Sequence, residues 1–356
     1  MPAITKEQIE TPALIIDMDI LESNIRRMAD FFADKHARLR PHFKTHKSPA
    51  IAHMQIAAGA KGLCCAKLGE AQVLAESGIR DILIANQIVD TAKINCLAGL
   101  AKNTRIGVCV DNADNITDLS EAAQIHNSVI HILIEVEVGM ERCGVRTKEE
   151  VLSLAKQISE SKGLVFEGLQ AYAGQLSHKA DPEERINGTR EAAAKIREIK
   201  QYLTEKGLQI KEVSGHGTGT CNIRDDDNIW TEIQAGSYVF MDTDYERLGL
   251  CFEKSLTVLA TVIHKRHGTA ITDAGQKVCC KTMGLPIIKD HPGLGISLAE
   301  EHGIIKDEQD ELNYLQKIEY YPSHCCTTVN LHDYYYCVRG GLLEAVWPVA
   351  GRGKSR

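Results

Sequence analysis

Residues 105–136 read RIGVCV-DNADNITDLSEAAQIHNS-VIHILIEV, and the fold class can be worked out from this stretch. Its two apolar runs, at 105–110 and 129–136, are short and rich in β-branched residues, which is typical of buried strands. The segment between them, 113–125, repeats apolar residues at helical spacing. A strand, a helix and a second strand in this order predict a βαβ unit with parallel strands.

The same alternation continues on both sides of this unit. Eight strands alternating with helices predict a parallel (β/α)8 TIM-type barrel over residues 1–244. A doubly wound sheet, which usually has fewer strands, is the alternative. The sequence also predicts where the helix at 182–206 begins, because Asp181 can serve as N-cap and Pro182 as first helical residue. The other expected strands are 38–44, 62–66, 82–85, 164–172, 209–214 and, more weakly, 232–240, and the other expected helices are 48–59, 68–78, 90–101, 147–160 and 182–206.

The pattern changes near residue 245. Strand-like segments read SLTVLATVIHK (255–265), TAITDAG (269–275) and YYYCVRGG (334–341), and Gly and Asp turns separate them. Because no clear helix-period segment lies among them, they predict a second, mostly β domain at 245–356. The N-terminal TPALIID (11–17) can pair with either domain.

Composition excludes several classes of protein. The 356 residues carry 41 Lys+Arg against 48 Asp+Glu, a net charge of −7, which argues against nucleic-acid or membrane-surface partners because these require a basic patch. No run of 18 apolar residues and no apolar segment at the start exist, so we expect neither a membrane span nor a secretory signal. The 12 cysteines contain no C-x-x-C spacing, and we expect most of them to be packing thiols in the cytoplasm.

The segment RPHFKTHK (40–47) places Lys44 among cationic and imidazole neighbours. Such neighbours favour the neutral amine, which is one condition for a nucleophilic, Schiff-base-forming lysine. An exposed basic run is the alternative reading. The segment follows the first barrel strand at its carboxyl end, where such barrels hold their catalytic groups.

Two glycine-containing turns follow the seventh and eighth expected strands, VSGHGTGT (213–220) and QAGSY (234–238). Backbone N–H groups and hydroxyls in such turns can bind an anion, and barrels commonly hold a phosphate there. Ordinary tight turns are the alternative. A dinucleotide site is not expected, because the spacing is not G-x-G-x-x-G and residues 221–230 do not open a helix.

The segment PSHCCTTVNLHD (322–333) contains a candidate metal pair. His324 and Cys326 share a face if the segment is extended, and an imidazole with a thiolate suits zinc or a similar ion. Two protein ligands leave positions open for water or substrate. Cys325 would point away and pack.

These segments, together with VGMERCG (138–144), GLQAYAG (168–174), YVFMD (238–242) and EEHG (300–303), resemble the D-threonine aldolase and D-serine dehydratase family. Its members are pyridoxal-phosphate enzymes with the alanine-racemase type of fold, a (β/α)8 barrel followed by a β domain. The resemblance runs through nearly the whole chain in the right order, and it agrees with the fold expected above.

The resemblance implies roles for individual residues. Lys44 would hold pyridoxal phosphate covalently, Arg142 would contact the pyridoxal oxygen, and Tyr172 would face the ring nitrogen. An uncharged phenol at that nitrogen weakens the ring as an electron sink. The phosphate would lie among Ser214, Gly215, Gly217, Thr218, Gly236 and Ser237.

The resemblance also implies a divalent metal (zinc, manganese or magnesium) on His324 and Cys326, which would bind the substrate's β-hydroxyl. His178 would be the base that acts on that hydroxyl. The protein would be a homodimer whose substrate is a small D-β-hydroxy amino acid, with each barrel meeting the other chain's β domain.

Two reactions remain open for these residues. Retro-aldol cleavage of D-threonine-like substrates gives glycine and an aldehyde, whereas β-elimination from D-serine or D-3-hydroxyaspartate gives a 2-oxo acid and ammonia. The aldolase branch has His-Cys-Asp in the metal motif, and this chain has His324-Cys325-Cys326, the ligand type of the dehydratase branch. The other motifs look more like the aldolase branch, which we favour. The metal pair argues against a racemase, and the β domain argues against a non-catalytic cofactor carrier.

Overall fold

A computed structural model describes residues 3–223 and 228–356 and divides the chain into two compact units. Unit 1 contains Met1–Met28, Thr45–Ala50 and Ser237–Arg352, and unit 2 contains Ala29–Lys44, Ile51–Gly236 and Gly353–Arg356. The chain therefore passes from one unit to the other directly after Lys44 and directly after Gly236. The domain boundary expected near residue 245 is a different division and stays a prediction.

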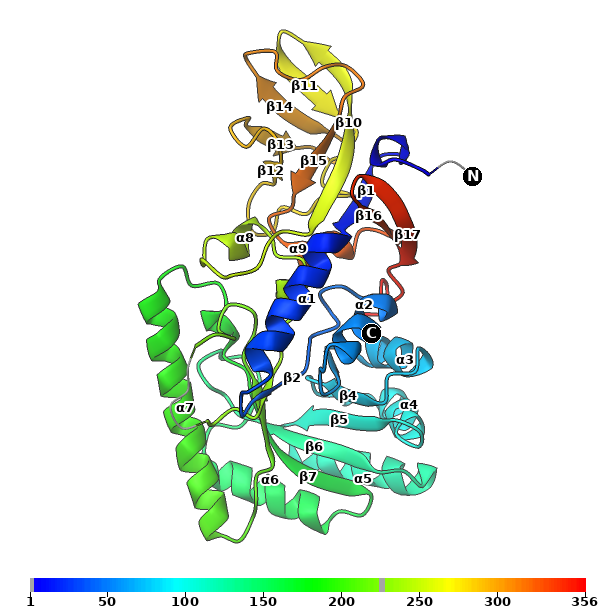
Figure 1. Cartoon of the computed structure of the whole chain (residues 1–356). Helices are drawn as coiled ribbons and strands as arrows, with labels where there is room; N and C mark the ends of the chain where they lie inside the picture. The colour runs from blue at the N-terminus through cyan, green and yellow to red at the C-terminus, as the bar shows by residue number, and fades with distance from the viewer. Residues whose placement is uncertain (1–2, 224–227) are drawn as a thin grey trace. The chain divides into compact units, whose positions relative to one another are not determined.

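Unit 2 is built on a parallel sheet of eight strands with helices α3–α6 along its outer side (Figure 1). The strand order is β2-β9-β8-β7-β6-β5-β4-β3, and a parallel bridge between His42 and Cys64 joins the two ends of this order. The expected barrel of alternating strands and helices is confirmed. The strands are β2 (Arg38–Leu39), β3 (Leu63–Cys65), β4 (Asp81–Ile84), β5 (Arg105–Val110), β6 (Ile130–Glu135), β7 (Leu164–Ala171), β8 (Glu212–Gly215) and β9 (Glu232–Ile233).

Side-chain caps explain where several helices of unit 2 begin. Asn112 accepts hydrogen bonds from two backbone N–H groups of α5, and Thr147 forms a reciprocal capping box with Glu150 of α6. Asp181 caps α7 and Pro182 is its first residue, as the sequence predicts. The helices are α2 (Pro49–Ala57), α3 (Leu68–Glu76), α4 (Thr91–Leu100), α5 (Ala113–His126), α6 (Lys148–Glu160) and α7 (Pro182–Glu205), with a short 3-10 turn η2 (Gly174–Leu176).

Unit 1 is mostly β, as expected. Its strand β1 pairs antiparallel with β10 and parallel with β16, so TPALIID belongs to the β-rich unit. Residues Leu14 and Ile16 of β1 are fully buried. The elements are η1 (Lys6–Gln8), β1 (Ala13–Asp17), η3 (Ser237–Val239), α8 (Thr243–Glu246), β10 (Leu256–Arg266), β11 (Gly268–Thr272), β12 (Ile287–Ile288), β13 (Ile296–Leu298), β14 (Gly303–Asp307), β15 (Lys317–Tyr321), α9 (Cys325–Val329), β16 (Tyr334–Arg339) and β17 (Leu342–Pro348).

Four sequence expectations differ from the structure. The strand expected at 38–44 is only β2, because residues 43–46 form a turn. The strand expected at 232–240 is only β9, because the chain turns at Gly236 and continues as η3. Helix α1 (Met18–Phe32), which runs from unit 1 into unit 2, is not among the expected helices. The last hundred residues contain one short helix, α9, where an extended segment was expected. No helix in the described part of the chain combines the length and the apolar character that a membrane span requires.

Candidate active site

The segment that carries Lys44 is held on both sides by backbone hydrogen bonds. On one side His42 N–H donates to the Ala235 carbonyl at 3.1 Å, and on the other Phe43 N–H donates to the Cys64 carbonyl at 2.7 Å. Phe43 is fully buried, whereas the Lys44 side chain is exposed. These bonds therefore fix the backbone just before Lys44, and Lys44 lies in the turn that follows with its amine accessible.

Tyr172 brings two other predicted residues together. The Lys44 ammonium nitrogen lies 5.9 Å from the centre of the Tyr172 ring, and the Arg142 guanidinium carbon lies 6.0 Å from the same centre. Tyr172 directly follows β7, and its hydroxyl lies 3.5 Å from that of Ser177. Two residues that follow different strands, Lys44 and Arg142, thus approach one aromatic ring in unit 2.

The glycines of the segment 214–220 are required by close packing. A Cβ on Gly215 would overlap the Ala171 carbonyl, and one on Gly219 would overlap the Ser177 carbonyl. A Cβ on Gly217 would lie 3.7 Å from the Tyr172 hydroxyl. The loop therefore lies against the Tyr172–Ser177 segment, and its bare backbone offers N–H donors of the kind that a phosphate accepts.

His216 and Thr220 stiffen the same loop. His216 has a left-handed φ of 61°, its Nδ1 is 2.9 Å from the Thr220 hydroxyl, and its ring packs edge-on against Trp230 at 4.3 Å. Burial lowers the pKa of His216 to about 4, so the ring is neutral at pH 7. Residues 224–227, part of the stretch expected not to open a helix, lie outside the described residues.

Replacing Gly219 with alanine should disrupt this loop. The new methyl group would overlap the Ser177 carbonyl, so we expect a loss of about 1–3 kcal/mol in the free energy of unfolding. Urea denaturation measures this loss. Gly293→Ala is the control, because a Cβ at Gly293 meets no atom within 4 Å. Equal stability of the two variants would contradict the packing argument.

The other predicted phosphate residues have different surroundings. Ser214 is fully buried, and its hydroxyl donates to Glu232 at 2.6 Å and accepts from Gln234 at 2.8 Å. Any contact of Ser214 with a phosphate would thus use its backbone. Thr218 is buried, and Gly236 precedes the first residue of η3, Ser237.

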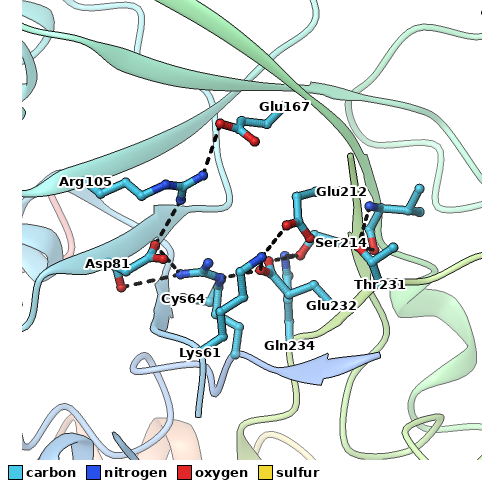
Figure 2. A network of polar contacts seen from close by, with 12 residues as sticks. Lys61, Cys64, Asp81, Arg105, Glu167, Glu212, Ser214, Thr231, Glu232 and Gln234 are labelled. Atoms are coloured by element: carbon cyan, nitrogen blue, oxygen red, sulfur yellow. Dashed lines mark hydrogen bonds and ion pairs between the residues drawn. The ribbon is translucent and has the colours of Figure 1, made fainter. Parts of the chain in front are cut away.

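Charged side chains on and beside the barrel strands form a network in unit 2 (Figure 2). Arg40, 2% exposed, pairs with Glu232 at 2.7 Å and with Asp81 at 2.8 Å. Lys61 pairs with Glu212 and Glu232, while Arg105 pairs with Asp81 and Glu167. A Cβ on Gly62 would overlap the Arg40 guanidinium, so this glycine provides the space for it.

Arg40 and Glu232 hold each other in the charged state. Burial alone would raise the pKa of Glu232, but the charges of Arg40 and Lys61 keep it below its ordinary value. Burial alone would lower the pKa of Arg40, and its two carboxylate partners raise it instead. Because Glu232 also accepts from Ser214, the network connects the strand before Lys44 to the strand before the glycine loop.

In unit 1, His324 and Cys326 interact directly. Hydrogen bonds from Cys325, His324 and Thr45 hold the pKa of the Cys326 thiol well below its ordinary value. Burial alone would lower the pKa of His324, but the Cys326 thiolate and Asp242 raise it to about 9. The thiol and the imidazole are therefore hydrogen-bonded to each other, and their sulfur and nitrogen donors fit a divalent ion once both have lost their protons.

The reason for this proximity differs from the one expected. His324 is the extended N-cap of α9 and Cys326 lies in its first turn, so the premise of a fully extended segment is wrong. Cys325 packs as expected: it is fully buried, and its N–H donates to Asp242 at 2.9 Å. The described residues contain no group of three or more His, Cys, Asp or Glu side chains placed to bind a metal. His324 and Cys326 stay the predicted metal ligands.

Unit 1 also contains two residues that directly follow predicted cofactor residues. Thr45, next to Lys44, has its hydroxyl 3.4 Å from the Cys326 sulfur, and Ser237, next to Gly236, has its hydroxyl 3.7 Å from the same sulfur. Thr45 and Ser237, which contact Cys326, are each joined by one peptide bond to a residue predicted to bind the cofactor. His178 lies in the turn after η2, directly after Ser177, and is half-buried.

Sequence reasoning missed four residues of the site region: Gln87, Asp111, Glu135 and Glu232. They lie in or directly after strands of unit 2, and Glu135 and Glu232 are buried. The available signal was a charged residue inside an apolar strand, such as Glu135 in VIHILIEV.

Comparison with known proteins gives consistent results. The alanine racemase N-terminal domain family matches residues 16–267, and the putative serine dehydratase domain family matches residues 255–338. A 3-hydroxy-D-aspartate aldolase from Paracoccus denitrificans (strain Pd 1222) is 39% identical over all of this chain and 95% of its own. A D-threonine aldolase from Arthrobacter sp. is 41% identical over 98% of this chain and 94% of its own. The crystal structure of D-threonine aldolase from Filomicrobium marinum superposes with a TM-score of 0.97 at 40% identity, covering 99% of this chain and 98% of that one.

Proposed function

Since this chain belongs to the D-threonine aldolase and D-serine dehydratase family, which has the alanine-racemase type of barrel, we propose that it is a pyridoxal-phosphate- and divalent-metal-dependent lyase of D-β-hydroxy amino acids. The observation that carries the proposal is the convergence of Lys44 and Arg142 on the ring of Tyr172. Retro-aldol cleavage is the favoured reaction, because relatives of 39% and 41% identity over nearly the full length are aldolases.

The predicted site residues would have separate roles in the reaction. When bound, pyridoxal phosphate withdraws electrons from the bonds of the substrate's α-carbon, and a divalent ion acidifies a hydroxyl that it binds. Lys44 would hold the cofactor through its exposed amine, and Arg142 would hold the pyridoxal oxygen. His324 and Cys326 would hold the ion. His178 would remove the proton of the β-hydroxyl, so that the Cα–Cβ bond breaks.

Dehydration is the second candidate, and one observation favours it. The candidate ligand Cys326 is hydrogen-bonded to His324, which lowers the pKa of its thiol, and His-x-Cys is the ligand type of the dehydratase branch. In this reaction Lys44 would take the α-proton and the β-hydroxyl would leave. A match to the putative serine dehydratase domain over residues 255–338 is consistent with it.

One experiment separates the two reactions. The purified protein, supplied with pyridoxal phosphate and Zn²⁺ or Mn²⁺, is incubated with D-threonine, D-serine and 3-hydroxy-D-aspartate, with and without EDTA. We expect glycine and an aldehyde, with activity lost in EDTA. A 2-oxo acid with ammonia would establish the dehydratase instead. No turnover of any of the three substrates would refute both.

Replacing Cys326 with aspartate should change the metal that supports activity. A thiolate favours zinc, whereas a carboxylate accepts the harder manganese or magnesium. Because the variant exchanges a thiolate ligand for a carboxylate, we expect zinc binding to weaken by at least about 10-fold, since even indirect partners of ligands are worth about 10–100-fold. Titration of the metal-free variant with Zn²⁺ and Mn²⁺, followed by activity, measures the change. Cys251→Ser, at an exposed thiol, is the control, and an unchanged metal order in Cys326→Asp would contradict the assignment.

A cytoplasmic homodimer is also part of the proposal. None of the twelve cysteines forms a disulfide, which is compatible with a reducing compartment. The dimer is supported by the family resemblance, and light scattering on the purified protein tests it.

A further inference from the structure

Three consecutive strands of unit 2 end in polar side chains that contact one another. Gln87 follows β4, Asp111 follows β5, and Glu135 is the last residue of β6. The Gln87 amide donates to Glu135 at 2.6 Å and to Asp111 at 3.1 Å. A single amide therefore bridges two carboxylates, which would otherwise repel each other.

The arrangement fixes the backbone of the loop that carries Arg142. The Asp111 oxygen that accepts from Gln87 also accepts from the Gly144 N–H, at 2.9 Å. At the other end of the loop, Glu137 accepts from the N–H groups of Gly139 at 2.6 Å and Glu141 at 3.0 Å. Gly144 has a φ of +102°, and a Cβ there would lie 2.7 Å from Glu137 N, so the turn needs glycine.

Among the residues that the structure describes, the Arg142 side chain has one ion-pair partner. Its guanidinium lies 3.5 Å from Glu135, which is 6% exposed, and 6.0 Å from the Tyr172 ring centre. The Arg142 side chain itself is half exposed. Glu135 is thus the rigid partner and Arg142 the movable one, because the carboxylate is buried and also held by Gln87.

We propose that Glu135, held by Gln87 against Asp111, is a positioning residue that directs the Arg142 guanidinium toward the pyridoxal oxygen. The proposal rests on the proposed function, in which Arg142 holds that oxygen. Glu135 acts through Arg142 and does not itself touch the cofactor. Asp111 fixes the loop backbone and Glu135 fixes the side chain, so the two carboxylates have separate tasks.

Positioning and charge make opposite predictions for Glu135→Gln. Removing a negative charge beside Arg142 would strengthen its positive field, which favours the ionised pyridoxal oxygen and the visible absorbance that accompanies it. Loss of positioning would instead release the guanidinium and reduce that absorbance. We expect the reduction, together with a loss of roughly 5- to 50-fold in affinity for pyridoxal phosphate.

A double-mutant cycle tests whether Glu135 acts through Arg142. The proteins are wild type, Glu135→Gln, Arg142→Gln and the double variant, with Glu121→Gln on the exposed face of α5 as the matched control. Each is titrated with pyridoxal phosphate, and visible absorbance, dissociation constant and Tm are measured. We expect the double variant to match Arg142→Gln, Tm to stay near that of the control, and Glu135→Asp to recover part of the absorbance.

The outcomes distinguish this inference from the proposed function. A wild-type protein that gains no visible absorbance on addition of pyridoxal phosphate would refute the proposed function itself. A wild-type protein that binds it, with Glu135→Gln indistinguishable from Glu121→Gln, would overturn only the positioning role. Strictly additive effects of Glu135→Gln and Arg142→Gln, or an increased absorbance in Glu135→Gln, would also overturn it.

Discussion

Replacing Lys44 with arginine should abolish the visible absorbance of the bound cofactor and lower kcat at least about 10³-fold, or about 4 kcal/mol in activation free energy. Arginine keeps the positive charge beside the Tyr172 ring but cannot form a Schiff base with an aldehyde, since its guanidinium stays protonated. Absorbance and steady-state kinetics measure the two effects. The Lys44 side chain is exposed, so Tm should not change.

The covalent link itself can be located. Reduction of the wild-type protein with borohydride followed by peptide mapping should place the pyridoxyl group on Lys44. Lys35→Arg, at another exposed lysine, serves as the control and should retain full absorbance. A reduced adduct on another lysine, or a Lys44→Arg protein that keeps the visible band, would refute the assignment.

Replacing Arg40 with methionine should cost about 3–5 kcal/mol in the free energy of unfolding, the largest stability effect that we expect in this chain. The substitution keeps the buried aliphatic volume but leaves Glu232 without its closest cation at 2.7 Å. Lys61, at 3.3 Å, compensates in part. Urea denaturation measures the loss. Arg105→Met is the control: its side chain is 34% exposed, and removing its pairs with Asp81 and Glu167 should cost less than about 1 kcal/mol.

The stability loss in Arg40→Met should depend on pH. In the wild type the pKa of Glu232 is lowered, so its ion pairs stabilise the fold above the ordinary value of 4.5 and are lost as the pH falls further. In the variant, burial raises the pKa of Glu232, and the charged carboxylate destabilises the fold at neutral pH. The difference between the two proteins should therefore be largest near pH 7 and shrink toward pH 4–5. A pH-independent difference would mean that packing, and not charge, dominates.

The barrel could be predicted from sequence because its strands are buried on both faces. The strand 105–110 is found at those residues, since a run of Ile and Val with no polar interruption has few other stable arrangements. Helix α1 was missed although Leu21, Ile25 and Met28 are buried at helical spacing. The assumption that the segment of His324 and Cys326 is extended was wrong because α9 begins at Cys325. A helix of five residues is too short to show helical periodicity in the sequence.

The polar network could not be predicted in the same way. Which cation meets Glu232 depends on the register between β2 and β9, where Arg38 is paired with Glu232, and on the approach of Lys61 from the neighbouring segment. The sequence shows the charges but not their partners. Glu135 was missed for a similar reason: its position beside Arg142 depends on the fold of the loop between them, which Gln87 and Asp111 determine from two other strands.

The place of β1 in its sheet has a consequence for synthesis on the ribosome. This apolar strand is made before the strands that pair with it, since β10 and β16 follow roughly 240 and 320 residues later. At roughly 5–20 residues per second, β1 waits about 12–50 s for β10 with both backbone edges unpaired. The barrel strands β2–β9 are all made in that interval. We therefore expect the nascent chain to need protection of its N-terminal segment, and ribosome-bound chains halted after β9 to bind chaperones through residues 13–17.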